Sequence, residues 1–474
     1  MYDTHAAGDS LYAPADTSRR FNLVAAVVTL IILSPALLIV TGPRPILAVL
    51  YFAVLGVMLL ITNPRICFYI WMAAGGLFYP AHLGGMLINP ADFAVLILLV
   101  AIVLDYLLRV RTEVHRTSFD APFMLLIGAA LMSIVLAHDR SLTITPTLRV
   151  IVIYLAYRVS FKMAQEIGVR RIVQVYLLIV VVLATINCVT LVIEGGQHRI
   201  FGLAWLPMET FCMTALPMAA AFLIWSSRPG ERLLYSTCCL VIGIAILGTQ
   251  SRAPMVAVLV ALPVLMWLVT RKAQRGQQKA NRWSILWLSV PLVGLALVVL
   301  MLSETAFQGS FERIGELINS MVRPEGTVSL RVVLWTAAIK AYLVNPVTGI
   351  GMGNFKAVSQ ILPDIRLVPV WYYIGGMSPH NVVLHWLAET GPLGAGALLW
   401  LAWRGVKVGY RQFGRSLDAQ DTQVAGALAI AMVVFALTIF YMRAWTWGQD
   451  GYIMALLFGL VAAWQRRQGH EAPS

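Results

Sequence analysis

The sequence predicts an all-α protein, a polytopic transmembrane helical bundle of 12–14 spans with one large loop outside the membrane that contains short helices. The first observation is composition, since 59% of the residues are hydrophobic, 12% are charged and the mean hydropathy is +0.79. Soluble domains carry about 25% charged residues. The second is a succession of apolar blocks long enough to cross a bilayer. The third is an uneven distribution of Lys and Arg between the segments that join these blocks.

Fourteen apolar blocks, each a candidate span, follow one another along the chain. The blocks at 66–80 and 148–165 are the weakest. We expect the first span to be retained, because no small-residue cleavage site follows it. The blocks lie at 21–41, 46–62, 66–80, 91–108, 121–137, 148–165, 172–193, 208–226, 233–248, 253–270, 284–303, 384–403, 424–441 and 449–464.

This pattern gives a simple domain organisation. Residues 1–20 and 466–474 are polar cytoplasmic tails, 21–303 form a bundle of about 11 spans, 304–380 form the large loop, and 381–465 form about three further spans. Because the loop is the only segment with room for a sizeable structure outside the membrane, we expect most of any chemistry there.

The basic residues favour one orientation. With the N-terminus in the cytoplasm, the predicted cytoplasmic segments hold 21 of the 35 Lys and Arg residues, and the opposite short loops hold six. The positive-inside rule therefore places both termini in the cytoplasm and the 304–380 loop in a bacterial periplasm or an equivalent compartment. The basic run at 271–282 is then a cytoplasmic anchor, with a nucleic-acid or lipid patch as the alternative.

Composition and spacing exclude several classes. The basic residues are scattered between apolar blocks, so a nucleic-acid partner is not expected despite the net charge of +13. The five cysteines lie inside apolar blocks and suggest neither a disulfide framework nor a zinc site. The acidic residues of the outer segments are not at metal-ligand spacing, and we expect no metal and no cofactor.

The large loop contains one clear helical pattern. Ser329 is a plausible N-cap, and Val332, Trp335, Ile339 and Tyr342 recur at helical spacing until Asn345-Pro346 ends the helix. This apolar stripe is expected to pack on the membrane surface or against neighbouring spans. Arg331 and Trp335 lie one turn apart.

Three of the six arginines in the outer short loops are singled out as candidates, since they stand against the positive-inside trend. Arg252 stands in a very short link between two spans, where a charged side chain is costly and usually faces a polar cavity or an anionic ligand. The alternative is an interfacial arginine that extends to lipid headgroups. Arg199 and Arg443 share this placement. Guanidinium groups match phosphate oxygens in geometry, so the outer arginines suggest a phosphate-containing ligand.

A histidine marks the start of the span that follows the loop. His380 stands in S-P-H-N, and Asn381, His385 and Glu389 are predicted to share one face of the helix that follows. A lone histidine is more often structural, but an imidazole can accept a proton near neutral pH. The glycines of G-I-G-M-G-N-F are interpreted as a turn that needs positive φ rather than a phosphate loop, because no G-K-[ST] follows them.

The motifs around these residues resemble those of the O-antigen ligase and polysaccharide polymerase family of bacterial inner-membrane glycosyltransferases. The resemblance covers roughly residues 195–410, and Ala253 stands where that family often has glycine. The matching pieces, in order, are T-Q-S-R-A-P-M at 249–255, Arg331 with Trp335, N-P-V-T-G-I-G-M-G-N-F at 345–355, and S-P-H-N-V-V-L-H-W-L-A-E-T-G-P-L-G at 378–394.

The resemblance implies a glycan donor carried on undecaprenyl pyrophosphate at the periplasmic face of the inner membrane. Carried over by position, Arg252 and Arg331 bind the pyrophosphate, and His380 is the general base on the acceptor hydroxyl. Arg199, Asn381, Glu389 and Arg443 are supporting candidates. A single displacement that inverts the anomeric carbon without a metal is implied.

The acceptor separates the remaining alternatives. Lipid A core as acceptor defines a ligase, which we place first, whereas another glycan repeat unit defines an O-antigen or exopolysaccharide polymerase. Transfer to protein is a third possibility within the family. A glycolipid transporter without chemistry is the competing class; the number of spans favours it, and the long outer loop and the absence of obvious broken-helix pairs disfavour it.

Overall fold

The structure is a computed structural model that describes residues 57, 61, 63–77, 81–83, 86–88, 90–109, 115–193, 208–249, 251–274, 289–295, 327–362, 378–440 and 450–471. These residues are almost entirely helical, which confirms the predicted all-α class. The exception is a short hairpin in which β1 (Ala81–Leu83) pairs antiparallel with β2 (Met86–Ile88).

The chain divides into two compact units, residues 1–71 with 93–113 and residues 72–92 with 114–474. In the first unit, α3 (Pro64–Leu77) meets α4 (Pro90–Arg109) where the Cys67 thiol lies 3.8 Å from the Ala94 carbonyl oxygen. Cys67 is free and buried. It therefore packs as a small apolar side chain, as predicted.

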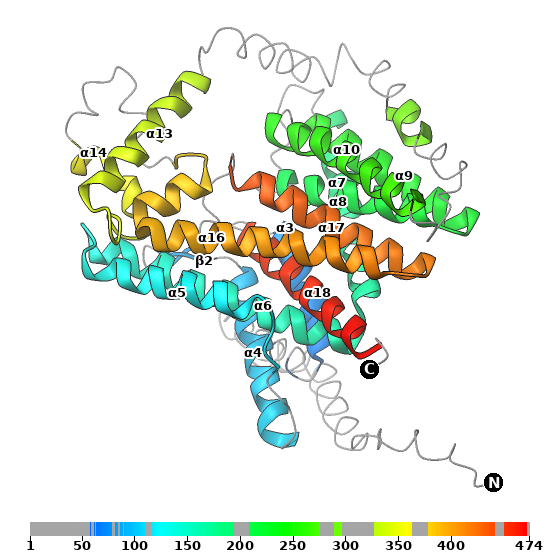
Figure 1. Cartoon of the computed structure of the whole chain (residues 1–474), viewed down its shortest axis with the longest axis horizontal. Coiled ribbons are helices and arrows are strands. Elements are labelled where there is room, and N and C mark those ends of the chain that lie inside the picture. The colour runs from blue at the N-terminus through cyan, green and yellow to red at the C-terminus, as the bar shows by residue number, and fades with distance from the viewer. Residues whose placement is uncertain are drawn as a thin grey trace, which may run out of the picture. The chain divides into compact units, whose positions relative to one another are not determined.

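The second unit holds the other described helices, which run past one another over much of their length (Figure 1). They are α5 (Asp120–Val135), α6 (Arg140–Ile167), α7 (Val169–Ile193), α8 (Met208–Trp225), α9 (Pro229–Gly248), α10 (Arg252–Gln274), α13 (Thr327–Val344), the 3-10 helix η1 (Asn354–Ala357), α14 (Val358–Ile361), α16 (Val382–Arg415), α17 (Ala419–Thr438) and α18 (Asp450–Glu471). Most of them overlap a predicted apolar block, but α13, η1 and α14 lie within the predicted loop, and α16 extends twelve residues beyond its block.

Six of the described helices are long and apolar enough to cross a membrane, so the protein is a multi-pass membrane protein. The predicted spans at 21–41 and 46–62, and most of 284–303, lie outside the described residues. The total of 12–14 spans therefore stays a prediction. The six helices comprise Arg140–Ile167, Val169–Val189, Pro229–Gly248, Pro254–Gln274, Val382–Arg415 and Ala419–Thr438.

Helix α17 is the most enclosed of these spans, and it packs against α8, α10 and α16. Small residues allow the close approach. A Cβ atom on Gly426 would collide with the Trp225 ring of α8, and one on Gly409 would lie 3.1 Å from the Ala429 Cα. Glycine and alanine at helix contacts let backbones come close where hydrocarbon surrounds the bundle.

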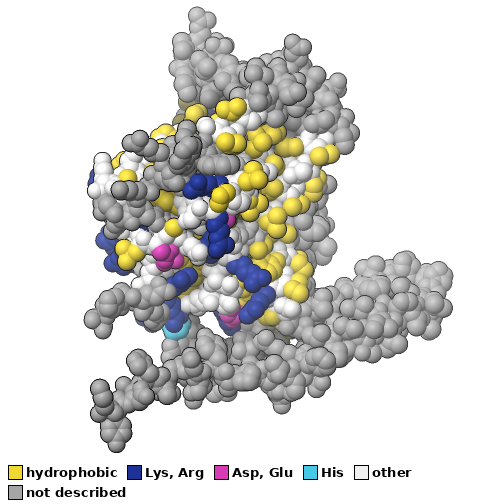
Figure 2. Space-filling model, turned by 90° about the vertical axis from the view of Figure 1, so that its right-hand side faces the viewer, with side chains coloured by type: hydrophobic (Ala, Val, Ile, Leu, Met, Phe, Trp, Pro, Cys, Tyr) yellow, Lys and Arg dark blue, Asp and Glu magenta, His cyan; other side chains and the backbone are white. Residues whose placement is uncertain are grey.

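One end of the second unit is joined by contacts among basic and polar side chains, and we call it the basic end. Lys272 of α10 donates to the Ser416 carbonyl oxygen after α16 at 2.7 Å and to the Thr422 hydroxyl of α17 at 2.9 Å. Arg232 of α9 donates to the Ser226 carbonyl oxygen after α8. The arginines at or near these helix ends are Arg170, Arg228, Arg271, Arg415 and Arg467, and Figure 2 shows Lys and Arg side chains gathered on this face.

Helix α13 belongs to the other end of the unit, and its start differs from the prediction, whereas packing of its predicted stripe on the membrane surface stays a prediction. It begins at Thr327, two residues before Ser329, so the prediction of Ser329 as N-cap is wrong. It ends at Val344, directly before Asn345-Pro346, as predicted. The face that packs on α14 and α16 carries Leu334, Ala337, Ala338 and Ala341, whereas Val332 and Ile339 of the predicted stripe are about half exposed. Because nearly every position of this helix is apolar, periodicity alone could not identify the packed face.

Candidate active site

A break in α16 creates the local geometry of the candidate site. Gly391 has a φ of 68° and a ψ of −167°, and Pro392 follows it. Proline has no N–H, so the Ala388 carbonyl loses its partner within the helix. The Ala388 and Glu389 carbonyl oxygens instead accept hydrogen bonds from the backbone N–H groups of Ile350 and Gly351, at 2.9 and 3.0 Å. At the break, carbonyl groups of α16 therefore bind the backbone of the glycine segment that precedes η1.

The glycine segment 349–353 adopts the backbone that the sequence predicts. Gly349, Gly351 and Gly353 have φ values of 70°, 98° and 77°. A Cβ atom on Gly351 would collide with Ala137, and one on Gly353 would lie 2.7 Å from the Leu142 carbonyl oxygen. Glycine is therefore required both by φ and by the closeness of the α5–α6 connection.

A buried asparagine fastens the same segment to the start of α6. The Asn354 Oδ1 accepts from the Asp139 N–H at 2.8 Å, and its Nδ2 donates to the Asp139 carbonyl at 3.1 Å and to the Thr143 hydroxyl at 2.8 Å. Asp139 in turn caps α6, since its carboxylate accepts from the Ser141 N–H. These hydrogen bonds with Ser141 lower the pKa of the Asp139 carboxyl. The segment is thus held from two sides.

A tryptophan of α13 contacts the segment that carries His380. The Trp335 Nε1 donates to the Pro379 carbonyl oxygen at 3.0 Å. Arg331 lies one turn earlier on α13, and side chains at this spacing have Cβ atoms about 6 Å apart. His380 has a φ of 51°, an uncommon value for a residue other than glycine. The hydrogen bond therefore brings the helix of Arg331 and the segment of His380 together.

Further along α16, His385 and Glu389 form a buried pair of an imidazole and a carboxylate. The His385 Nε2 is 3.0 Å from the Glu389 Oε1, and both side chains are only 2–3% exposed. Among the described residues, neither ring nitrogen of His385 has a partner with hydrogen-bond geometry, so the pair is a close approach rather than an aligned hydrogen bond. The same Glu389 oxygen accepts from the Phe355 N–H at 3.0 Å, and the Phe355 ring lies 5.6 Å from the imidazole.

The Lys356 ammonium lies within electrostatic range of Glu389, and Arg149 lies within range of Lys356. Loss of hydrating water lowers the pKa of the Lys356 ammonium, the Glu389 carboxylate opposes that change, and the positive charge of Arg149 adds to it. Lys356 stands in η1 and Arg149 in α6. Positive charge near the glycine segment therefore comes from η1 and α6, in addition to Arg331 on α13.

The structure describes some of the predicted site residues with their side chains, one only by its backbone, and others not at all. Arg331 and His380 are brought to neighbouring segments, as above. Arg252 is the first residue of α10, and its side chain is not among those described. Helices α10 and α16 run in the same direction, because Trp267 stacks on Tyr410 and Lys272 reaches Ser416. Lys272 lies near the last residue of α10, at the basic end. The first residue of α10, Arg252, therefore lies at the opposite end of the bundle, where α16 also begins. Arg199 and Arg443 lie outside the described residues.

The predicted face of Asn381, His385 and Glu389 needs a correction. Only His385 and Glu389 share it. Asn381 is the N-cap of α16, and its side chain accepts from the Leu384 N–H at 3.0 Å. A cap residue has extended rather than helical dihedral angles, which removes it from the face of the helix.

Sequence reasoning missed Asn354, Asp139, Arg149 and Lys356. An asparagine directly after a glycine cluster was one available signal, because such residues often fix the turn through their side chains. The position of Asp139, two residues before Ser141 in the polar segment between two apolar blocks, was another, since Asp is a preferred N-cap. Among the described residues, no group of three or more His, Cys, Asp or Glu side chains is arranged to hold a metal ion.

Fold and site together define a multi-pass helical membrane protein with a buried polar cluster at the end opposite the basic end. Residues 237–399 match a family model described as O-antigen ligase, about a third of the chain. The match contains Arg252, Arg331, His380 and Glu389, and it confirms the family resemblance that the motifs predicted. It supports a membrane glycosyltransferase-like role of the ligase or polymerase type. No curated protein matches the chain.

Proposed function

We propose that the protein transfers a glycan from undecaprenyl pyrophosphate to an acceptor hydroxyl at the periplasmic face of a bacterial inner membrane. Lipid A core is the acceptor that we place first, and a glycan repeat unit, as in a polymerase, is the alternative. The observation that carries the proposal is the hydrogen bond from Trp335 to Pro379. It joins the helix of a candidate phosphate-binding arginine to the segment of a candidate base, within the part of the chain that matches the family.

In the proposed reaction, His380 accepts the proton of the acceptor hydroxyl while its oxygen attacks the anomeric carbon of the donor. The bond from that carbon to the pyrophosphate oxygen breaks, and the electron pair leaves with the lipid pyrophosphate. One displacement inverts the anomeric configuration. Arg252 and Arg331 neutralise the charge that grows on the leaving group, which fixed guanidinium groups do most effectively where water is partly excluded. No metal ion is needed in this scheme.

Arg199, Asn381, Glu389 and Arg443 have supporting roles in the proposal. The N-cap formed by Asn381 fixes the direction in which the chain enters α16 immediately after His380. Glu389 accepts from Phe355 and so fixes the other end of the same helical segment. Arg199 and Arg443 are proposed to add positive charge at the outer mouth.

The gathering of arginines at the basic end supports the proposed orientation. Basic side chains prefer the cytoplasmic side of a membrane, and the segment of His380 lies toward the other end of the bundle. Both termini are then cytoplasmic and the site is periplasmic. Cleavage within residues 271–282 by external trypsin, which cuts after Lys and Arg, in intact spheroplasts would overturn this orientation.

The direct test uses purified protein in lipid with a defined undecaprenyl-pyrophosphate glycan and a core or repeat-unit acceptor. We expect transfer by the unmodified protein and none by His380→Ala. Wild-type rates in that variant would remove His380 from the proposed role. Transport of donor without any transfer would instead support the competing class, a glycolipid transporter.

The hydrogen bond from Trp335 to Pro379 has its own test. Trp335→Phe keeps an aromatic side chain but removes the N–H that reaches Pro379, and misplacement of reacting groups by about 1 Å can cost roughly a hundredfold in rate. We expect a transfer rate at least about tenfold lower, with the protein still folded. Trp403→Phe is the matched control, because Trp403 is 63% exposed on α16. Equal rates in the two variants would leave the Trp335 contact without a functional role.

A gene deletion distinguishes the two acceptors. Loss of a ligase leaves bare core lipopolysaccharide while lipid-linked polymer accumulates. Loss of a polymerase leaves single repeat units or no exopolysaccharide. Loss of glycoprotein staining alone would indicate a protein acceptor.

A further inference from the structure

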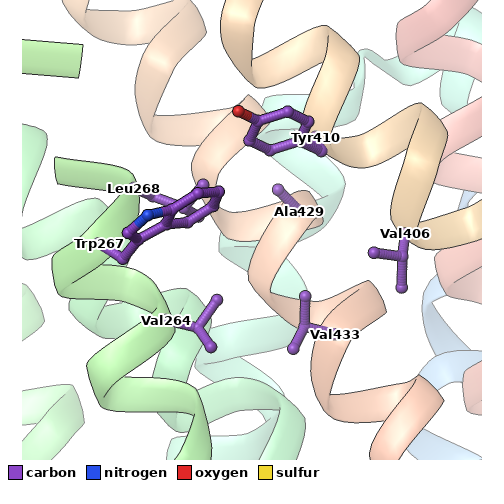
Figure 3. A pocket seen from close by; sticks show the side chains of 7 residues that line it. All are labelled: Val264, Trp267, Leu268, Val406, Tyr410, Ala429 and Val433. Carbon is purple, nitrogen blue, oxygen red and sulfur yellow. The ribbon is translucent and has the colours of Figure 1, made fainter. Parts of the chain in front are cut away.

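Three candidate spans leave an apolar groove between them near the basic end (Figure 3). Its volume is about 170 Å³, and Figure 3 shows the Trp267 and Tyr410 rings above the side chains of Val264 and Val433. An apolar cavity of about 150 Å³ holds a molecule the size of benzene rather than water. The lining comes from α10 (Val264 and Trp267), α16 (Val406 and Tyr410) and α17 (Ala429 and Val433).

The groove is part of the packed framework. The Trp267 and Tyr410 rings stack with centroids 5.6 Å apart and planes 19° apart. The close approach of Gly409 to Ala429 holds α16 and α17 together along one side. Lys272, only 3% exposed, ties the ends of the three helices five residues beyond Trp267, a rise of about 8 Å. A ligand would therefore find this groove already formed.

The groove is lined by apolar side chains yet open to the outside of the bundle. Trp267 is 44% exposed and lies within a candidate membrane span, so its exposed face is expected to meet lipid rather than water. An apolar chain from the bilayer is the natural occupant, since it exchanges one hydrocarbon environment for another and gains packing contacts.

Positive charge lies beside the aromatic edge of the groove. The Arg271 guanidinium lies over the Trp267 ring, 5.4 Å from its centroid, and Arg271 is exposed at the end of α10. On α16, the Lys407 ammonium lies 5.9 Å from the centroid of the Trp403 ring. Aromatic rings with adjacent Arg and Lys are typical of the level of lipid headgroups. Basic residues there attract anionic lipids.

We infer that this groove is a binding site for an anionic diacyl phospholipid such as phosphatidylglycerol. One acyl chain lies along Val264, Val406 and Val433, and the phosphate lies against Arg271. The inference does not rest on the proposed glycan transfer, because the groove is near the basic end, away from His380. It gives Arg271, at the start of the basic run, a specific partner.

The test uses the full-length protein purified with a neutral detergent and given phosphatidylglycerol or phosphatidylcholine. We expect native mass spectrometry to retain phosphatidylglycerol preferentially, and the melting temperature to rise with it more than with phosphatidylcholine. Val264→Phe should fill the groove and abolish both effects. Leu259→Phe, at a position of α10 that is 68% exposed, is the control and should retain both. Melting without added lipid checks that each variant is folded.

The charge is tested separately. Arg271→Gln should weaken phosphatidylglycerol binding about fivefold, since one basic residue near a membrane surface contributes about 1 kcal/mol. Arg228→Gln removes a charge at the same end, from an exposed residue before α9, and should leave binding unchanged. Equal retention of the two lipids, or unaltered binding in both Val264→Phe and Arg271→Gln, would overturn the inference. Retention of a polyprenyl phosphate in place of phosphatidylglycerol would overturn it as well.

Discussion

Glu389 and His385 form a buried pair one turn apart on α16, with the carboxylate Oε1 3.0 Å from the imidazole Nε2. The same oxygen accepts the Phe355 N–H, so one side chain joins the first segment of α16 to η1, which directly follows the glycine segment. His380 and the cap residue Asn381 begin that segment. The helical segment that follows His380 is therefore anchored by Glu389, nine residues further along the chain.

We expect Glu389→Ala to destabilise the protein by about 3 kcal/mol, because removing one member of a buried polar pair leaves the other groups unpaired. Glu389→Gln keeps an oxygen that can accept from Phe355, so its melting temperature should lie between those of the Ala variant and the unmodified protein. Thermal melting of the purified protein checks this order.

The control for this series is Glu166→Ala. Glu166 pairs with Lys162 at 3.9 Å on the surface of α6 and is partly exposed. Surface pairs contribute less than about 1 kcal/mol. If Glu166→Ala were as damaging as Glu389→Ala, the buried pair would have no special importance for stability.

The break in α16 gives a second prediction, from two glycines five residues apart. Gly391→Ala places a side chain at a φ of 68°, where it would collide with the Val347 carbonyl. Backbone strain of this kind costs about 1–3 kcal/mol before the collision is counted. Gly396→Ala meets nothing within 4 Å and should be neutral or stabilise the helix by up to about 1 kcal/mol. Melting temperatures that moved in the same direction for both variants would contradict the structure of the break.

The attachment of the glycine segment to α6 gives a third prediction. Asn354→Ala removes the hydrogen bonds that a completely buried side chain makes with Asp139 and Thr143, and we expect a loss of about 2–4 kcal/mol in stability. Gln360→Ala, at an exposed position of the neighbouring α14, should change stability by less than about 0.5 kcal/mol. Hydrogen exchange of the Asp139 amide, which is faster only in the first variant if the contact is real, checks the location of the effect.

Much of this fold could be predicted because a bilayer imposes a simple rule of length and polarity. The apolar block at 253–270 became α10, and the block at 424–441 became α17. The glycines at 349, 351 and 353 could also be interpreted correctly, because no G-K-[ST] follows them and a turn with positive φ accounts for their presence. These inferences depend on local chemistry alone.

The site was harder to predict because its contacts join segments that are far apart in the chain. Nothing near Asn354 indicates that its partner is Asp139, more than 200 residues earlier. The face on which α13 packs was also hidden, since Val332 and Leu334 are equally apolar and only the neighbouring helix decides which is buried. Asn381 was assigned to a helix face when it is a cap, because helix limits from apolar blocks are uncertain by a few residues.

The proposal that glycan transfer needs no metal ion gives a fourth prediction. If guanidinium groups alone neutralise the pyrophosphate, the purified protein should transfer glycan at an unchanged rate in excess EDTA. The measurement is the initial rate before and after chelation, with magnesium, manganese and calcium added back in turn. Full inhibition by EDTA that a divalent ion reverses would overturn the arginine-only scheme, while leaving the role of His380 open to its own test.

The fifth prediction separates a specific arginine from general positive charge on α13. Arg331 lies one turn before Trp335, whereas Lys340 is exposed nearer the end of the same helix. Arg331→Gln should lower the transfer rate about a hundredfold, equivalent to about 3 kcal/mol of transition-state stabilisation. Lys340→Gln should leave the rate within about twofold. Arg331→Lys keeps the charge but loses the planar fork, so its rate should fall between the two. Equal losses at 331 and 340 would mean that the helix supplies only a diffuse field, and the proposed contact of Arg331 with pyrophosphate would be wrong.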